Sequence, residues 1–229
     1  MRFQDAAKDA RAIVYAQVQA DPLVARVAAA LAGATTAARV MARAVMNGES
    51  TDPDGWRTAF PSLFGSAAPI PDRAAAEEVL AAALAVADRG DQVRSQLRGA
   101  IVEELTQRLL ARRVPGGQVR RERRILFDGV RAEIHPYDVT VELEGRAEAY
   151  DCKWGARGIN PDVLLQLDSA RANAADEDER LAVALVIFDA GLSCRVRLER
   201  ETSPVAGTGL VSLETLDCLA AGPPGTPAR

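Results

Sequence analysis

Polar and apolar residues alternate in two short segments between residues 138 and 153. Asp138 to Leu143 reads Asp, Val, Thr, Val, Glu, Leu, and Arg146 to Lys153 follows after the pair Glu144-Gly145. Alternation with a period of two is typical of a half-buried strand, and glycine supplies the positive φ that a tight hairpin turn needs. The pattern therefore predicts a β-hairpin with a two-residue turn.

This hairpin would bring three charged side chains together. With a two-residue turn, Asp138 lies opposite Asp151, and directly opposed residues hold their Cβ atoms about 5 Å apart on one face. Lys153 lies two residues beyond Asp151 and therefore points to the same side. A three-residue turn would instead shift the register and place the two aspartates on opposite faces.

The remaining pattern predicts a helical first part and a mixed second part. Leu97, Ile101, Leu105 and Leu109 recur at helical spacing, whereas the continuous apolar run 181–188 is typical of a central strand buried on both faces. We expect helices over residues 22–47, 73–88, 92–113, 161–175 and 210–220, a loop over 48–72, strands within 118–134 with a turn at Asp128-Gly129, and strands over 181–188 and 194–201.

These elements predict a helical N-terminal region over residues 1–90, an α/β (α+β) domain with a mixed central sheet flanked by helices over 91–221, and a disordered tail over 222–229. The chain has 229 residues, and its 48% apolar content supports a substantial core. Residues 1–90 are the expected place for oligomerisation, recognition or regulation, as a homodimer contact or a surface for a partner protein.

Cysteine and histidine usage limits the chemistry of the chain. Cys152, Cys194 and Cys218 are far apart and form no CxxC pair, which excludes a four-thiolate cluster and favours a reducing, cytoplasmic location. The single histidine, His135, excludes most zinc sites. We recognise no secretory signal and no membrane span, and we expect a soluble protein with no membrane partner.

A divalent cation would resolve the repulsion between Asp138 and Asp151. Mg²⁺ takes one or two carboxylates together with water and substrate phosphate, and a neighbouring lysine could orient or deprotonate the attacking water or neutralise charge on the phosphate. Of the 28 basic residues only Lys8 and Lys153 are lysines, so lysine is conspicuous at this position. The alternative is a chance acidic-x-Lys triplet with no catalytic role.

Seven arginines lie between residues 108 and 124, against the single acid Glu122, although the whole chain has a net charge of −4. This run could form a track for phosphate groups of nucleic acid, or it could be a solvated strand edge that resists aggregation. The arginines of the predicted nucleic-acid-binding surface are Arg112, Arg113, Arg120, Arg121, Arg123 and Arg124.

From Gly99 onward the chain resembles the PD-(D/E)XK nuclease superfamily, whose restriction-endonuclease-like core is helix, three-stranded meander, helix, strand. The segment GAIVEEL resembles the first motif with Glu103, four residues after a glycine, although Glu103 and Glu104 could each be ordinary surface acids. HPYDV resembles the second motif with Asp138, with Tyr137 as an additional residue, and YDCKW resembles the third with Asp151 and Lys153. Gln166 is similar in place to a glutamine that follows the motif in several nucleases.

The resemblance implies a nuclease that hydrolyses phosphodiester bonds and leaves a 5′-phosphate. Asp138, Asp151, the Cys152 carbonyl and Glu103 would bind Mg²⁺ or Mn²⁺, Lys153 would position the water, and Gln166 would complete the catalytic set. We favour DNA over RNA as the substrate. Two alternatives are a non-catalytic nucleic-acid-binding or assembly module on the same fold, and a nuclease held inactive by its helical N-terminal region.

Overall fold

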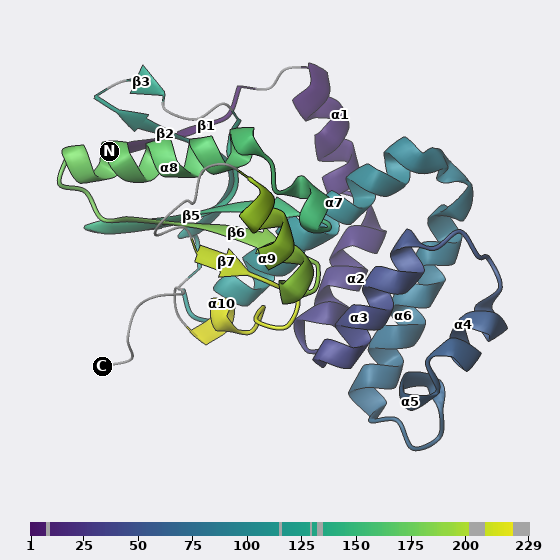
Figure 1. Cartoon of the computed structure of the whole chain (residues 1–229). Coiled ribbons are helices and arrows are strands. Elements are labelled where there is room, and N and C mark those ends of the chain that lie inside the picture. The colour runs from purple at the N-terminus through teal and green to yellow at the C-terminus, as the bar shows by residue number, and fades with distance from the viewer. Residues whose placement is uncertain (8–9, 115, 129, 132–134, 202–208, 222–229) are drawn as a thin grey trace. The chain divides into compact units, whose positions relative to one another are not determined.

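The chain folds into two compact units that do not coincide with the predicted boundary at residue 90. In the computed structural model, which describes residues 1–7, 10–114, 116–128, 130–131, 135–201 and 209–221, one unit comprises residues 1–8 and 109–229 and the other residues 9–108. We call them the sheet unit and the helical unit (Figure 1). The first residues of the chain thus belong with its C-terminal half.

The helical unit is built around α6, on which α2 and α3 pack. Four side chains of these three helices, Val27, Leu31, Met41 and Val79, are fully excluded from solvent. Among the described residues its elements are α1 (Ala10–Gln19), α2 (Pro22–Ala32), α3 (Thr36–Asn47), α4 (Pro53–Ala59), α5 (Pro61–Phe64), α6 (Ile70–Val86), the short 3₁₀ helix η1 (Ala87–Arg89) and α7 (Gly90–Leu110). The last two residues of α7, Leu109 and Leu110, are assigned to the sheet unit.

Two expectations for this unit are corrected. The helix predicted over 22–47 is two helices, because the chain turns at Gly33 and the Thr35 backbone N–H and hydroxyl bind the buried Asp72 carboxylate. The loop predicted over 48–72 contains α4, α5 and the start of α6. Asp52 caps α4 by accepting a hydrogen bond from the Asp54 N–H, a local start signal that the proline and glycine content obscured.

The sheet unit has a mixed sheet, as predicted. Its strands, in the spatial order β1-β2-β4-β5-β6-β7 with β3 paired to β2, run antiparallel from β1 to β5 and parallel from β5 to β7. The described elements are β1 (Arg2–Asp5), β2 (Val119–Phe127), β3 (Val130–Arg131), β4 (Tyr137–Leu143), β5 (Arg146–Lys153), η2 (Ala156–Gly158), α8 (Pro161–Asp176), β6 (Leu181–Ile187), α9 (Gly191–Arg200), β7 (Gly209–Val211) and α10 (Cys218–Ala221).

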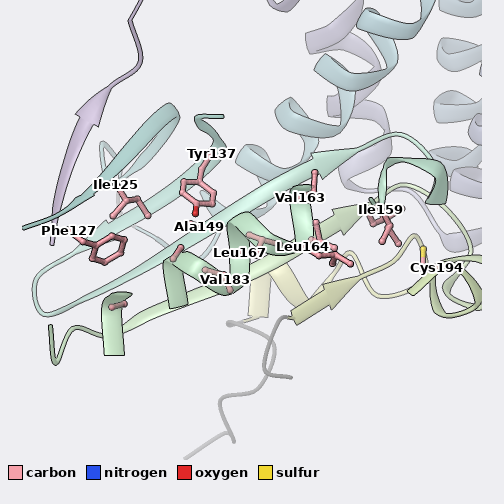
Figure 2. Packing of buried hydrophobic residues seen from close by; sticks show 14 residues of the cluster. Ile125, Phe127, Tyr137, Ala149, Ile159, Val163, Leu164, Leu167, Val183 and Cys194 are labelled. Carbon is pink, nitrogen blue, oxygen red and sulfur yellow. The ribbon is translucent and has the colours of Figure 1, made fainter. Parts of the chain in front are cut away.

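A single apolar layer joins α8 to one face of this sheet. Figure 2 shows Ile125 and Phe127 of β2 and Val183 of β6 in the same cluster as Leu164 and Leu167 of α8, and all five are buried. Asn160 starts α8 by accepting a hydrogen bond from the Val163 N–H, as its Asn-Pro sequence indicated. Tyr137 of β4 and Ala149 of β5 belong to the same buried cluster, so this layer includes both strands that carry the candidate site.

Three expectations for the sheet unit were wrong. Residues 2–5 form a strand rather than part of a helical region, and residues 210–220 form β7, a turn and the start of α10 rather than one helix. The strand predicted over 194–201 is helix α9, because Cys194 and Leu198, four residues apart, face the core together. The tail 222–229 and Gly129 of the Asp128-Gly129 turn lie outside the described residues, while Phe127 pairs with Val130 across that turn.

Among the described helices, none has both the length and the apolar composition needed to cross a membrane.

Candidate metal-binding and catalytic site

The β4–β5 hairpin has the predicted register. Leu143 pairs with Arg146 and Val139 with Tyr150, and Gly145 in the two-residue turn has a φ of 72°. Continuing the register by one residue sets Asp138 opposite Asp151. Positive φ is the conformation that favours glycine at a tight turn, so Gly145 fixes which residues face each other.

Asp138, Asp151 and Lys153 converge at the end of this hairpin. The Lys153 ammonium donates to Asp151 Oδ1 and lies 3.5 Å from Asp138 Oδ2, which also accepts a hydrogen bond from the Cys152 backbone N–H at 2.6 Å. The side chains of Asp138, Asp151 and Lys153 are 17%, 5% and 31% exposed. The predicted grouping of two acids and one amine is thus present in a largely buried position.

The surroundings shift the pKa values of this cluster. Burial, followed by repulsion from Asp138, raises the pKa of Asp151 to about 6, although Lys153 acts in the opposite direction. Burial by itself would lower the pKa of Lys153, but attraction by Asp138 and Asp151 outweighs it and the pKa is raised. Lys153 therefore stays protonated at neutral pH, which suits orientation or charge neutralisation better than proton abstraction.

Asp138 and Asp151 are the residues that fit a divalent cation. Two close carboxylates, one of them costly to ionise in its buried position, match the oxygen ligands that Mg²⁺ takes together with water and phosphate. Within the part of the chain that the structure describes, no group of three or more His, Cys, Asp or Glu side chains is arranged to hold a metal. The Cys152 N–H binds Asp138, and a role for its carbonyl stays a prediction.

Glu103 lies in the helical unit, on α7, and its described contacts are there. Its buried carboxylate accepts hydrogen bonds from the Tyr15 hydroxyl and, at 2.8 Å, from Gln19 Nε2. A side chain at Gly99 would approach the Tyr15 oxygen to 3.2 Å, so the Gly-x-x-x-Glu spacing accommodates α1. Glu104 pairs with Arg108 one turn along. A metal-binding role for Glu103 stays a prediction.

Gln166 lies on α8 beside the segment that leads into β4. Its side-chain oxygen accepts a hydrogen bond from the His135 backbone N–H at 3.0 Å, and its backbone oxygen lies 3.5 Å from the Tyr137 hydroxyl. These contacts hold the chain directly before Asp138. They support a positioning role for Gln166, and direct participation in catalysis stays a prediction.

The predicted arginine track divides into paired and exposed residues. Arg113 is held by Glu148, by the Tyr150 hydroxyl and by the Leu219 carbonyl, and its side chain is 11% exposed. Arg123 binds Glu142 at 2.7 Å and also Asp5. These contacts give Arg113 and Arg123 partners within the sheet unit, and a nucleic-acid-binding role for them stays a prediction.

The other four arginines of the predicted surface differ in exposure. Arg112 and Arg120 are exposed, whereas Arg121 and Arg124 are half-buried. Glu122, which lies between Arg121 and Arg123 on β2, has a φ of 51°, which is uncommon for a residue other than glycine. The regular pairing of β2 with β4 is interrupted at Glu122. Arg112 and Arg120 therefore remain the best candidates to contact a phosphate backbone.

Sequence reasoning missed Gly158 and Asp189, which lie around Lys153. Asp189 directly follows the buried run that ends in Phe188, and an acid at the carboxyl end of a parallel strand is a signal that could have been recognised. Gly158 gives no such signal, because its importance depends on which side chain lies against it.

No family model, curated protein or solved structure matches this chain.

Proposed function

We propose that this chain is a metal-dependent nuclease that hydrolyses phosphodiester bonds, with DNA as the favoured substrate. The observation that carries the proposal is the convergence of Asp138, Asp151 and Lys153 at the end of one hairpin, where a buried pair of like charges needs a cation. The antiparallel β2-β4-β5 strands, followed by α8 and a strand β6 parallel to β5, support it by matching the element order of a restriction-endonuclease-like core.

Each residue of the site has a distinct task in this proposal. Asp138 and Asp151 would hold Mg²⁺ or Mn²⁺, which would supply Lewis-acid activation of the phosphate and of the attacking water. The protonated Lys153 donates hydrogen bonds to that water or to a phosphate oxygen and balances the negative charge that develops. Arg112 and Arg120 bind backbone phosphates outside the reacting bond.

A second candidate is a nucleic-acid-binding or assembly module without catalysis. It is favoured by the ion pairs of Lys153, which offset part of the negative charge of the two carboxylates, and by the absence of a third metal-ligating side chain at this cluster among the described residues. Such a module would bind nucleic acid through the exposed arginines and would leave it intact.

Cleavage assays separate the two candidates. Purified protein should cut at least one of double-stranded DNA, single-stranded DNA, branched DNA and RNA when Mg²⁺ or Mn²⁺ is present, and EDTA should stop the reaction because the carboxylates cannot act without the cation. End-labelled products should carry a 5′-phosphate. Binding without cleavage of any substrate, with either ion, would establish the module instead.

The exposed arginines Arg112 and Arg120 should contribute to the affinity for DNA through the release of counterions. Replacing Arg112 and Arg120 by alanine should weaken DNA binding and reduce the slope of log K against log salt by about 2, since each phosphate contact contributes roughly 0.9 for a duplex. Fluorescence anisotropy in EDTA, at several salt concentrations, measures this slope. Arg180→Ala, an exposed arginine after α8, is the matched control and should leave the slope unchanged.

A further inference from the structure

The turn η2 lies directly against the side chain of Lys153. A Cβ atom built at Gly158 would lie 2.5 Å from Lys153 Cβ, 2.7 Å from Cγ and 3.1 Å from Cδ. The first two distances are far inside van der Waals contact, and they involve the part of the lysine nearest its own backbone, which cannot move aside easily. Only glycine at position 158 therefore leaves room for Lys153 in its observed conformation.

A buried carboxylate from the neighbouring strand fixes that turn. Asp189, which is 4% exposed, accepts a hydrogen bond from the Ala156 N–H at 2.8 Å through one oxygen and from the Ala190 N–H at 2.7 Å through the other. The Phe188 N–H donates to the Lys153 carbonyl at 2.9 Å. The carboxyl end of β6 thus holds both the lysine backbone and the turn that covers its side chain.

An aromatic pair closes the same region. The rings of Trp154 and Phe188 are stacked with centroids 4.6 Å apart, so the residues that follow Lys153 on β5 and Ile187 on β6 are packed together. Gly155, which follows Trp154, has a φ of 94°, and its carbonyl accepts a hydrogen bond from the Gly158 N–H at 3.0 Å. Backbone, side chain and turn are therefore all constrained within a few residues of the ammonium.

We propose that Gly158 and Asp189 are positioning residues that hold the Lys153 ammonium over Asp138 and Asp151. The catalytic value of this arrangement rests on the proposed nuclease function, whereas the arrangement itself can be measured without it. Gly158 confines the lysine side chain by close contact, and Asp189 fixes the turn that carries Gly158. Neither residue needs to touch the substrate.

The two lysines of the chain allow a direct test of lysine position. Wild type and Gly158→Ala would be treated with a limiting amount of an acylating reagent, and modification of Lys153 relative to Lys8 would be followed by peptide mass spectrometry. Lys153 should react slowly in wild type, because its amine is largely buried in ion pairs, and several-fold faster in Gly158→Ala. Gly116→Ala is the control, since an added methyl group there meets no atom within 4 Å.

Cleavage kinetics provide the second readout. Misplacing the ammonium by about 1 Å should lower kcat by roughly 10- to 100-fold in Gly158→Ala, while KM for the nucleic acid changes little because the phosphate-binding arginines are untouched. Gly116→Ala should cleave as wild type does. Thermal unfolding of all variants shows whether the fold is retained.

The outcomes distinguish this inference from the proposed function. Faster Lys153 modification in Gly158→Ala, in a protein whose wild type cuts no substrate, supports the positioning device and contradicts the nuclease. Unchanged modification and unchanged cleavage in a folded Gly158→Ala overturn the positioning device and leave the nuclease standing. If Gly158→Ala does not fold, Asp189→Asn provides the test, because it keeps the size of the side chain. Unaltered reactivity of Lys153 in Asp189→Asn would overturn the proposal.

Discussion

Replacing Asp151 by asparagine should lower the rate of metal-dependent cleavage by about a thousandfold or more, because the loss of one of two carboxylate ligands removes several kcal/mol of transition-state stabilisation. The change keeps the shape of the side chain and removes a buried charge that faces Asp138. Folding should therefore be retained, and DNA binding in EDTA should stay close to that of wild type. Initial cleavage rates at saturating Mg²⁺ and Mn²⁺ measure the effect.

The matched control is Glu144→Gln at the turn of the same hairpin. Glu144 is an exposed acid at the opposite end of β4 and β5 from Asp151, so its neutralisation should leave the cleavage rate unchanged. Cleavage by Asp151→Asn at the wild-type rate would contradict the assignment of this site. A large loss in Glu144→Gln as well would indicate a general effect of charge on substrate binding.

Because of the raised pKa of Asp151, the cleavage rate should depend on pH. A carboxyl whose pKa is raised to about 6 by burial and by Asp138 must lose its proton before it can bind a cation. At metal concentrations well below saturation, wild-type cleavage should therefore rise with pH through about 6, where half of the Asp151 carboxyls are ionised, and level off about one unit higher. A profile without this rise would show that ionisation of Asp151 does not limit cation binding.

The largest effect on stability is expected at Arg113. Its guanidinium binds both oxygens of Glu148, whose side chain is 4% exposed, and it also donates to the Tyr150 hydroxyl and the Leu219 carbonyl. Arg113→Ala would leave the Glu148 charge buried without its cation, which destabilises proteins by about 3–5 kcal/mol. Urea unfolding followed by circular dichroism measures this loss.

Two further variants test whether the loss of stability in Arg113→Ala comes from the unpaired charge of Glu148. Arg112→Ala, at the exposed neighbouring position, should change stability by no more than about 0.5 kcal/mol. The double variant Arg113→Met with Glu148→Gln should recover most of the loss, because the amide replaces the charge and still accepts from Tyr150. Equal stability of Arg113→Ala and wild type would show that the ion pair does not hold this part of the sheet unit together.

Local sequence signals predicted the elements that depend on neighbouring residues. The register of the β4–β5 hairpin followed from alternation and from the Glu144-Gly145 turn, and it is confirmed by the pairing of Leu143 with Arg146. The start of α8 followed from Asn160-Pro161, and β6 from its apolar run. In these cases the residues that determine the structure lie close to one another in the sequence.

Elements decided by distant residues were not predictable in the same way. Alternation over 194–201 suggested a strand, but the Cys194–Leu198 face packs into the core cluster as a helix. Residues 2–5 form a strand because they pair with β2 at the edge of the sheet, where Arg2 pairs with Leu126. Tertiary context overrides local preference at such positions.

The contacts of the candidate site also differ in whether nearby or distant residues determine them. Asp138, Asp151 and Lys153 lie on one hairpin, so alternation alone could bring them together. The pairing of Arg113 with Glu148 and the contact of Gly158 with Lys153 depend on how separate segments pack, which charge runs and glycine positions do not reveal. The arginine run was therefore interpreted as one surface, although Arg108, Arg113 and Arg123 lie in ion pairs.

The position of β1 determines how the sheet unit could be studied in isolation. A fragment that starts at residue 109 would lack this strand and would leave one side of β2 with unpaired backbone groups, which promote aggregation between edges. Joining residues 1–7 to residue 109 through a flexible linker should restore the pairing. A synthetic peptide of the same first residues could serve as well, by adding to the open edge as a donated strand.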